Sequence, residues 1–370
     1  MQYKRMAIEV ESPEEMGYSN IQYNLAESSV RDIYFRDLKI NLDDLFLCYG
    51  EHRGNTALRN AIIANNVGLC ADDVLVCPSA ATALFVISTT LLNPSNHLIV
   101  LRPNYATNIE TPRAIGCQIS YVDLVFENEF QFNIEDIKSK IQNNTTLISL
   151  TLPHNPTGVV FDDKIIEEII ALAEQKNILL LVDETYRYLN FQSELKPYYA
   201  TKSNHIISVC SLSKAHGVPG IRTGWLINKN KLLMQQLLAA KEQIVITNSV
   251  VDEAIALHIL SQGDFLKDTH RHISANFKIL KHWMEHEQHF LEWTAPASGV
   301  VCFPRIKDIY NVDTKQFYKV LFDKYKTIVG PGHWFEQPDR YMRIGFAYPH
   351  PEELKQGLKN IAASLEATIS

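Results

Sequence analysis

From about residue 70 the chain alternates short apolar runs with longer amphipathic stretches, and this alternation limits the possible folds more than any other feature. Within Asp162–Lys176, isoleucines recur at the spacing of one helix face. The runs near Leu147 and Ile178 are apolar on both faces, as expected for a sheet covered by helices on each side. The pattern therefore predicts an α/β domain with a mainly parallel sheet. The expected strands are Val74–Cys77, His97–Leu101, Cys117–Val122, Leu147–Leu150, Ile178–Val182 and Ile206–Cys210, and the expected helices are Ser79–Leu92, Thr107–Ile115 and Asp162–Lys176.

Beyond Gly263 the pattern changes, and helical stretches flank short strand-like pieces. This texture predicts a second, smaller α+β domain. Its expected helices are Phe265–Glu287 and His350–Glu366, and its expected strands are Gly299–Phe303 and Tyr341–Phe346.

The length of 370 residues suits two domains that share an interface. Residues before about 45 are too few to fold alone, and we expect them to pack against the smaller domain. The prediction is therefore a large domain over 45–270 and a small domain formed by 1–44 together with 271–370.

Composition excludes several classes of protein. The 35 basic and 42 acidic residues give a net charge of −7 without a basic patch, so nucleic acid is not an expected partner. Six scattered cysteines fit reduced thiols. The N-terminus turns acidic before any apolar stretch, so we expect no signal peptide. Apolar runs such as Ile178–Val182 are shorter than the roughly 18 residues of a membrane span, so no membrane partner is expected and the predicted location is cytoplasmic.

Four of the predicted strands end in unusual residues. Ligands of open α/β sheets bind at the carboxyl ends of the strands, so these segments are the first place to look for a site. Taken singly, each has an ordinary structural explanation: Asn155–Gly158 could be a turn, Asp183 a helix cap and Lys214 a solvated lysine. Their order along one chain favours a functional explanation. The four segments are Cys77–Thr82, Leu152–Gly158, Val182–Tyr186 and Ser211–Arg222.

At these residues the chain resembles the fold-type I enzymes that use pyridoxal 5'-phosphate (PLP), the class I/II aminotransferase superfamily. The matching motifs are Pro-His-Asn-Pro-Thr-Gly, an Asp-Glu-x-Tyr turn, and Ser-x-Ser-Lys with an arginine eight positions after the lysine. The resemblance runs from about Asn24 to Phe346. It implies the PLP-transferase fold of the aspartate aminotransferase type, with a mainly parallel sheet in a large domain and a smaller α+β domain.

The resemblance implies a role for each motif residue near the ring of PLP. Lys214 matches the lysine that holds PLP as a Schiff base. Asp183 matches the carboxylate that keeps the pyridine nitrogen protonated. Asn155 and Tyr186 match the residues that hydrogen-bond the phenolic oxygen of the ring. Tyr105 matches the aromatic residue that stacks on the ring, although an ordinary core tyrosine is the alternative.

The phosphate of PLP needs several hydrogen-bond donors. Ser211 and Arg222 match two of them, and the resemblance implies a bidentate contact for the arginine. The backbone N–H groups of Ala80 and Ala81 would add more at a helix N-terminus. Ser79 stands where this turn usually has glycine, and Ala81 lacks the hydroxyl often found at its position.

On the substrate side, Arg343 occupies an apolar alternating strand, where an arginine needs a carboxylate or another partner. It matches the arginine that binds the substrate α-carboxylate, together with Asn155; a structural salt bridge is the alternative. Tyr49 resembles the tyrosine that reaches the phosphate of a neighbouring subunit, which implies a homodimer. His216 replaces the aromatic or aliphatic residue common after the lysine. The segment Asn24–Ser29, which the resemblance implies to lie near the substrate, matches no substrate class, and no second substrate arginine can be assigned.

The resemblance predicts an aminotransferase that moves an amino group between an amino acid and a 2-oxo acid through Lys214. The same residues also serve relatives that break other bonds. The alternative is therefore a PLP-dependent C–S β-lyase or amino-acid decarboxylase.

Two other classes are less favoured. His282–His286 has the H-x-x-E-H form of some zinc proteases, but no further acidic ligand is evident, and a solvated helix face explains it better, so no metal site is predicted. A transcriptional regulator of this fold needs an added DNA-binding module, and the roughly 20 residues before the resemblance are too few for a helix-turn-helix.

Overall fold

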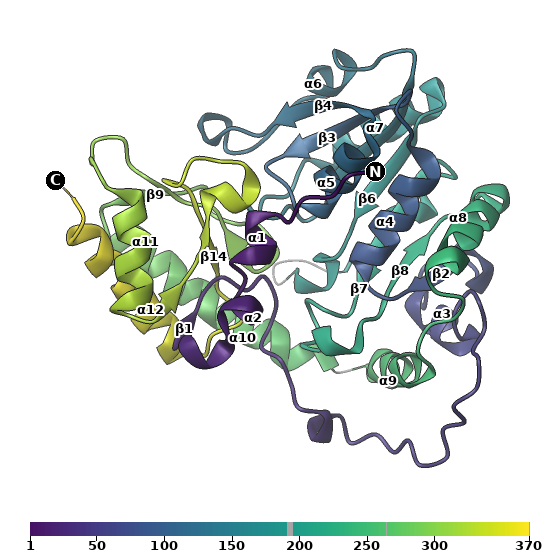
Figure 1. The fold of residues 1–370 in the computed structure, drawn as a ribbon, viewed down its shortest axis with the longest axis horizontal. Coiled ribbons are helices and arrows are strands. Elements are labelled where there is room, and N and C mark those ends of the chain that lie inside the picture. The colour runs from purple at the N-terminus through teal and green to yellow at the C-terminus, as the bar shows by residue number, and fades with distance from the viewer. Residues whose placement is uncertain (191–194, 264, 370) are drawn as a thin grey trace.

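The computed structural model describes residues 1–190, 195–263 and 265–369. A seven-stranded sheet lies at its centre, in the order β2-β8-β7-β6-β5-β3-β4. Strand β8 pairs antiparallel with both of its neighbours, and every other pair in this sheet is parallel. The mainly parallel sheet predicted from the sequence is thus confirmed (Figure 1). The strands are β2 (Val74–Cys77), β3 (His97–Arg102), β4 (Gln118–Asp123), β5 (Thr145–Thr151), β6 (Leu179–Asp183), β7 (Ile206–Ser211) and β8 (Gly224–Ile227).

Helices cover both faces of this sheet, and the alternation of side chains along a strand explains how. In β3, Leu98 and Val100 pack in one cluster with α4 and α8, while Ile99 and Leu101 pack on the opposite face with α7. Full burial of each such side chain contributes roughly 1.5–3 kcal/mol. The helices of this region are α3 (Thr56–Ile62), α4 (Ala80–Leu91), α5 (Thr107–Ile115), α6 (Ile134–Lys138), α7 (Asp163–Lys176), α8 (Lys231–Ile244) and α9 (Val250–Leu260).

A second region contains a three-stranded antiparallel sheet, in the order β10-β14-β13, and the long helices α10 and α12 pack together beside it. Figure 1 shows this region to one side of the large sheet, with the first helices of the chain between the two. Its elements are α10 (Phe265–His282), α11 (Thr314–Asp323), α12 (Pro351–Glu366), β9 (Leu291–Glu292), β10 (Val301–Cys302), β11 (Arg305–Ile306), β12 (Thr327–Ile328), β13 (Gly330–Pro331) and β14 (Met342–Gly345).

Residues 1–38, the N-terminal segment, contain α1 (Ala7–Val10), α2 (Pro13–Met16) and β1 (Tyr23–Asn24). Strand β1 pairs in parallel with β12, and the backbone N–H of Gly345 donates to the carbonyl of Leu25 at 2.7 Å. A Cβ on Gly345 would lie 1.8 Å from the carbonyl oxygen of Glu27, so only glycine permits this contact. The segment therefore packs on the second region, and we retain the division into 45–270 and 1–44 with 271–370 as a proposal.

Two sequence expectations differ in their extent from the structure. The predicted helix Phe265–Glu287 is α-helical only to His282, and a π-helical turn follows over Trp283–Glu287. Trp283 and Met284 are both buried in that turn. The predicted strand Gly299–Phe303 contains only two residues in ladder pairing, Val301 and Cys302. Among the residues that the structure describes, no helix combines the length and apolarity of a membrane span.

Candidate active site

A cavity of about 580 Å³ lies where the N-terminal segment meets the carboxyl ends of the large sheet. Its walls come from sequence positions that are far apart, because α2, the start of α4, the ends of β5, β6 and β7, and β14 all contribute side chains. Of the predicted site residues, Ala80, Ala81, Tyr105, Asn155, Asp183, Tyr186, Ser211, Lys214, Arg222 and Arg343 line it. Tyr49 does not.

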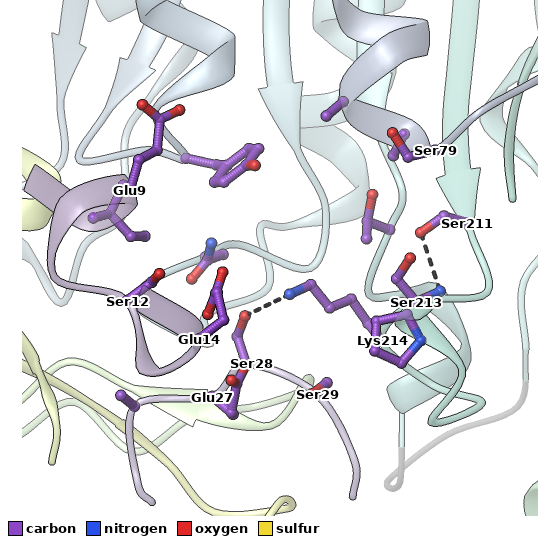
Figure 2. A pocket seen from close by; sticks show the side chains of 18 of the residues that line it. Glu9, Ser12, Glu14, Glu27, Ser28, Ser29, Ser79, Ser211, Ser213 and Lys214 are labelled. Atoms are coloured by element: carbon purple, nitrogen blue, oxygen red, sulfur yellow. Dashed lines mark hydrogen bonds between the residues drawn. The ribbon is translucent and has the colours of Figure 1, made fainter. Parts of the chain in front are cut away.

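Lys214 follows β7, and its amine points into the cavity (Figure 2). The Nζ atom donates to Ser28 Oγ at 3.1 Å, and the hydroxyl of Tyr186 donates to the same oxygen at 3.0 Å. The carbonyl of Lys214 accepts from the backbone N–H of Val30 at 2.9 Å. The N-terminal segment thus fixes the lysine at both its backbone and its amine. Sequence reasoning gave Ser28 no role within the segment Asn24–Ser29, because no local motif marks it.

Asp183 is the last residue of β6 and is only 4% exposed. Its Oδ1 accepts from the backbone N–H of Thr185 at 3.1 Å and from the Thr185 hydroxyl at 2.5 Å, and Asn108 donates to Oδ2 at 3.4 Å. Burial raises the pKa of Asp183, while these hydrogen bonds and the charge of Lys214 lower it. Within the described residues no cation forms an ion pair with this carboxylate. The arrangement suits a bound group that brings its own positive charge.

The N-terminus of α4 forms another wall of the cavity. Ser79 caps this helix by accepting from the backbone N–H of Thr82 at 3.2 Å, and it does so at a φ of +98°. A Cβ on Gly224 would lie 2.4 Å from the backbone nitrogen of Ala80, so glycine lets β8 run directly past this helix start. The first N–H groups of a helix have no partner within it and favour an anion such as phosphate.

Two more predicted phosphate ligands lie on the same side. Ser211 ends β7, and its hydroxyl accepts from the backbone N–H of Ser213 at 3.4 Å. Arg222 is exposed, and its Nη1 donates to the carbonyl of Pro219 at 2.7 Å. Figure 2 shows Ser79 and Ser211 on one side of the Lys214 amine.

Arg343 lies in β14 and is 5% exposed. Its Nη1 donates to Asn155 Oδ1 at 3.1 Å, and its Nη2 donates to the carbonyl of Ala26 at 2.7 Å. The guanidinium also lies over the ring of Phe335, at 5.0 Å from its centre. Nε has no hydrogen-bond partner, and no carboxylate of the described chain lies within ion-pair distance. Burial accordingly lowers the pKa of Arg343. A buried cation held only by neutral acceptors is suited to bind an anionic ligand.

Tyr105 and Tyr49 differ in their surroundings. Tyr105 is half-buried, lines the cavity and also packs against the core between the sheet and α4. Tyr49 is 86% exposed and lies in the extended stretch before α3, which Figure 1 shows along the outer edge of the molecule. Its predicted contact with a neighbouring subunit stays a prediction.

Carboxylates of the N-terminal segment line the cavity on the side opposite Ser79 and Ser211, as the labelled glutamates in Figure 2 show. Burial raises the pKa of Glu27, while the charges of Lys214 and Arg343 lower it. Sequence reasoning did not identify this group, because its members become neighbours only in the folded chain. The carboxylates are Glu9, Glu14, Glu15, Glu27 and Asp32.

The H-x-x-E-H pattern lies far from this cavity in the sequence and spans the junction of α10 and the π-helical turn. The rings of His282 and His286 lie 5.0 Å apart, and His282 forms an ion pair with Glu287 at 3.4 Å. The side chain of His282 is 64% exposed. Among the residues with described positions, no three potential metal ligands gather at one point.

Comparison with known proteins gives consistent matches along the chain. The sequence model of the family "Aminotransferase class I and II" matches residues 24–361. Capreomycidine synthase of Streptomyces vinaceus is 26% identical over 359 residues, which cover 94% of this chain and 91% of that protein. An aspartate aminotransferase of Sulfurisphaera tokodaii is 26% identical over 348 residues, 90% and 86% of the two chains. The crystal structure of a PLP-dependent aminotransferase from Streptococcus suis superposes with a TM-score of 0.89 at 26% identity, covering 100% and 99% of the two chains.

Proposed function

This chain belongs to the aminotransferases of class I and II, whose cofactor is PLP, and we propose that it moves an amino group between an amino acid and a 2-oxo acid. The observation that carries the proposal is that Lys214, the buried carboxylate of Asp183 and the buried guanidinium of Arg343 line one cavity. When bound, PLP supplies an electron sink for negative charge at the substrate α-carbon.

The residues fit this cofactor at both of its ends. Asp183 is buried without a cationic partner in the described chain, and a protonated pyridine nitrogen would supply one. Lys214 would hold the cofactor covalently, Tyr105 would stack on the ring, and Asn155 and Tyr186 would donate to its phenolic oxygen. Phosphate donors would come from Ser211, Arg222 and the backbone N–H groups of Ala80 and Ala81.

We propose separate roles for Lys214 and Arg343 toward the substrate. We assign removal of the α-proton to Lys214 Nζ, since Ser28, which also accepts from Tyr186, holds that amine at the wall of the cavity. Arg343, with Asn155 beside it at 3.1 Å, would bind the α-carboxylate and so orient the α-hydrogen. The N-terminal segment lines this part of the cavity and, with a substrate bound, would limit the access of water to the reacting atoms.

The active unit that we propose is a homodimer. Tyr49 lies outside the cavity of its own chain and is 86% exposed, which suits a contact with a second copy. The proposed contact is with the phosphate bound by the neighbouring subunit. Substitution of Tyr49 by phenylalanine should then weaken PLP binding without changing the far-ultraviolet circular dichroism spectrum of the protein.

A half-reaction tests the proposed function. Purified, PLP-loaded protein is mixed with a pool of amino acids in the absence of any 2-oxo acid, and the released cofactor is identified by mass. One equivalent of pyridoxamine phosphate per site supports transamination, and division of the pool identifies the donor. A protein that binds no PLP would contradict the whole proposal.

A second candidate is a PLP-dependent C–S β-lyase or amino-acid decarboxylase. One comparison supports this second candidate: capreomycidine synthase, which is not named as an aminotransferase, matches 94% of the chain. The residues that would hold the cofactor do not determine which bond breaks. The same half-reaction separates the candidates: substrate that is consumed while the cofactor remains PLP favours the second.

A further inference from the structure

We propose that the amino donor is a basic amino acid, whose α-carboxylate binds Arg343 and whose cationic side chain faces Glu14, Glu27 and Asp32. The inference deepens the proposed function and rests on it. It starts from the charges that line the substrate side of the cavity.

Three of the carboxylates on this side form no ion pair within the described residues. Glu14 lies in α2, while Glu27 and Asp32 follow β1, and all three line the cavity. In the described part of the chain, none of them forms an ion pair with lysine, arginine or histidine. The hydroxyl of Tyr18 donates to Oε1 of Glu27 at 3.4 Å. Burial raises the pKa of Glu27 and of Asp32, while the charge of Lys214 lowers both, so these acidic groups respond to a cation placed in this cavity.

The two other carboxylates of the wall differ from each other. Glu15 forms an ion pair with Arg5 at 3.4 Å, and Glu9 accepts from the backbone N–H of Met6 at 3.0 Å. Glu15 therefore serves as the matched control, because it is a wall carboxylate that already has a cation of the protein beside it.

Arg343 is the second, independent observation that points to a ligand. Its side chain is only 5% exposed. Its Nε has no hydrogen-bond partner in the described structure, and the residue lines the same cavity. The charges of both Arg343 and Lys214 act on Glu27, so an anion-binding group and an acidic group border the same space. A basic amino acid carries the complementary pair of charges, an α-carboxylate and a distal cation.

The same charges disfavour an acidic donor. A second carboxylate on the substrate would face Glu14, Glu27 and Asp32, and like charges at close range repel. The lining cations of the described chain already have other assignments or partners. Lys214 is assigned to the cofactor, Arg222 to its phosphate and Arg343 to the α-carboxylate, and Arg5 is paired with Glu15. Figure 2 shows Glu14 and Glu27 on the side of the Lys214 amine away from Ser79 and Ser211. A distal cation would therefore extend away from the phosphate end.

Binding to the PLP-loaded protein tests the inference directly. Calorimetry would compare arginine with citrulline, which has the same length and an uncharged end, and lysine with norleucine. We expect the charged member of each pair to bind at least about tenfold more tightly, and the ratio to fall as salt is added. Equal affinity within both pairs, or tighter binding of citrulline and norleucine, overturns the inference.

Three variants locate the effect. Glu27→Gln and the exposed Glu14→Gln should each reduce the arginine-to-citrulline affinity ratio by roughly threefold to tenfold, because each removes one charge and keeps the side-chain shape. Glu15→Gln should leave the ratio unchanged. A ratio that falls equally in all three variants would assign the preference to net charge and contradict the proposed contacts. Release of pyridoxamine phosphate is measured separately, so a failure of transamination is distinguishable from a failure of the charge preference.

Discussion

Two walls of the same cavity are built differently. The wall at the carboxyl ends of β5, β6 and β7 is buried and densely hydrogen-bonded, and Asp183 alone accepts three hydrogen bonds there. The wall from the N-terminal segment carries exposed residues such as Glu14 and Asp32 beside the half-buried Glu27. The sheet wall can fix a cofactor rigidly, while the N-terminal wall can vary its charges without disturbing a buried network. Cofactor chemistry and substrate choice are therefore supplied by different parts of the chain.

The largest expected effect is on turnover, and it comes from replacing Lys214 in the sheet wall. Replacement of Lys214 by alanine removes both the group that would hold the cofactor and the proposed base, and we expect turnover to fall at least about 10⁴-fold. Steady-state rates and the absorbance of bound PLP would be measured together. Glu15→Gln on the opposite wall serves as the comparison and should retain turnover. Normal activity of the Lys214→Ala protein would refute the assignment.

The second effect concerns the junction of the two walls at Arg343. Arg343→Lys keeps the charge but loses the guanidinium fork that donates to Asn155 and to the carbonyl of Ala26. We expect kcat/KM for the amino donor to fall roughly 10- to 100-fold, with substrate affinity accounting for most of the loss. The same variant should bind PLP as tightly as the original protein. A loss of PLP binding with unchanged substrate affinity would instead assign Arg343 to cofactor binding, together with the sheet wall.

The motifs of the sheet wall could be predicted from the sequence, because each stands directly after an apolar run that becomes a strand. Asn155, Asp183 and Lys214 were identified this way, and the structure brings them to one cavity. The resemblance placed the segment Asn24–Ser29 near the substrate but gave Glu27 and Ser28 no role, since they approach Lys214 only after β1 pairs with β12, a contact between segments about 300 residues apart. No periodicity or motif encodes such a contact.

The same limit applies to the fold. The parallel strands were predicted to within one or two residues because long apolar runs mark them, whereas β8 was not predicted. This strand has four residues and follows the functional loop, so it carries too little periodicity to be recognised. Its antiparallel place between β2 and β7 depends on Gly224 passing the start of α4, which is a tertiary contact.

A pH series tests a buried histidine behind the sheet wall, His154, in the segment that follows β5. Burial lowers the pKa of His154 to about 3 from an ordinary value of 6.5, so the unfolded chain binds the proton first as the pH falls. The stability contributed by the neutral ring is present above about pH 6.5 and is lost progressively toward pH 3. At pH 5 the loss amounts to roughly 2 kcal/mol.

Chemical denaturation between pH 8 and pH 4.5 would measure this effect. His154→Asn keeps a polar group near Thr157, whose hydroxyl lies 2.8 Å from Nδ1 of His154, but it cannot take up a proton. The stability of the variant relative to the original protein should therefore improve as the pH falls from 6.5. A difference between the two proteins that stays constant with pH would contradict the explanation.

The smallest expected effect concerns the backbone at the start of α4. Ser79 holds a φ of +98°, a region that costs a residue with a side chain of order 1 kcal/mol or more but costs glycine little. Ser79→Gly removes that strain and also the Ser79 cap to Thr82, a loss of only a few tenths of a kcal/mol when glycine is the replacement. The balance predicts a gain in stability of about 0.5–1 kcal/mol. Ser79→Ala keeps the strain and loses the cap, so it should instead destabilise the protein by about 1 kcal/mol. Urea unfolding of both variants measures this difference in sign, and two losses of equal size would show that the hydroxyl outweighs the strained backbone at this wall of the cavity.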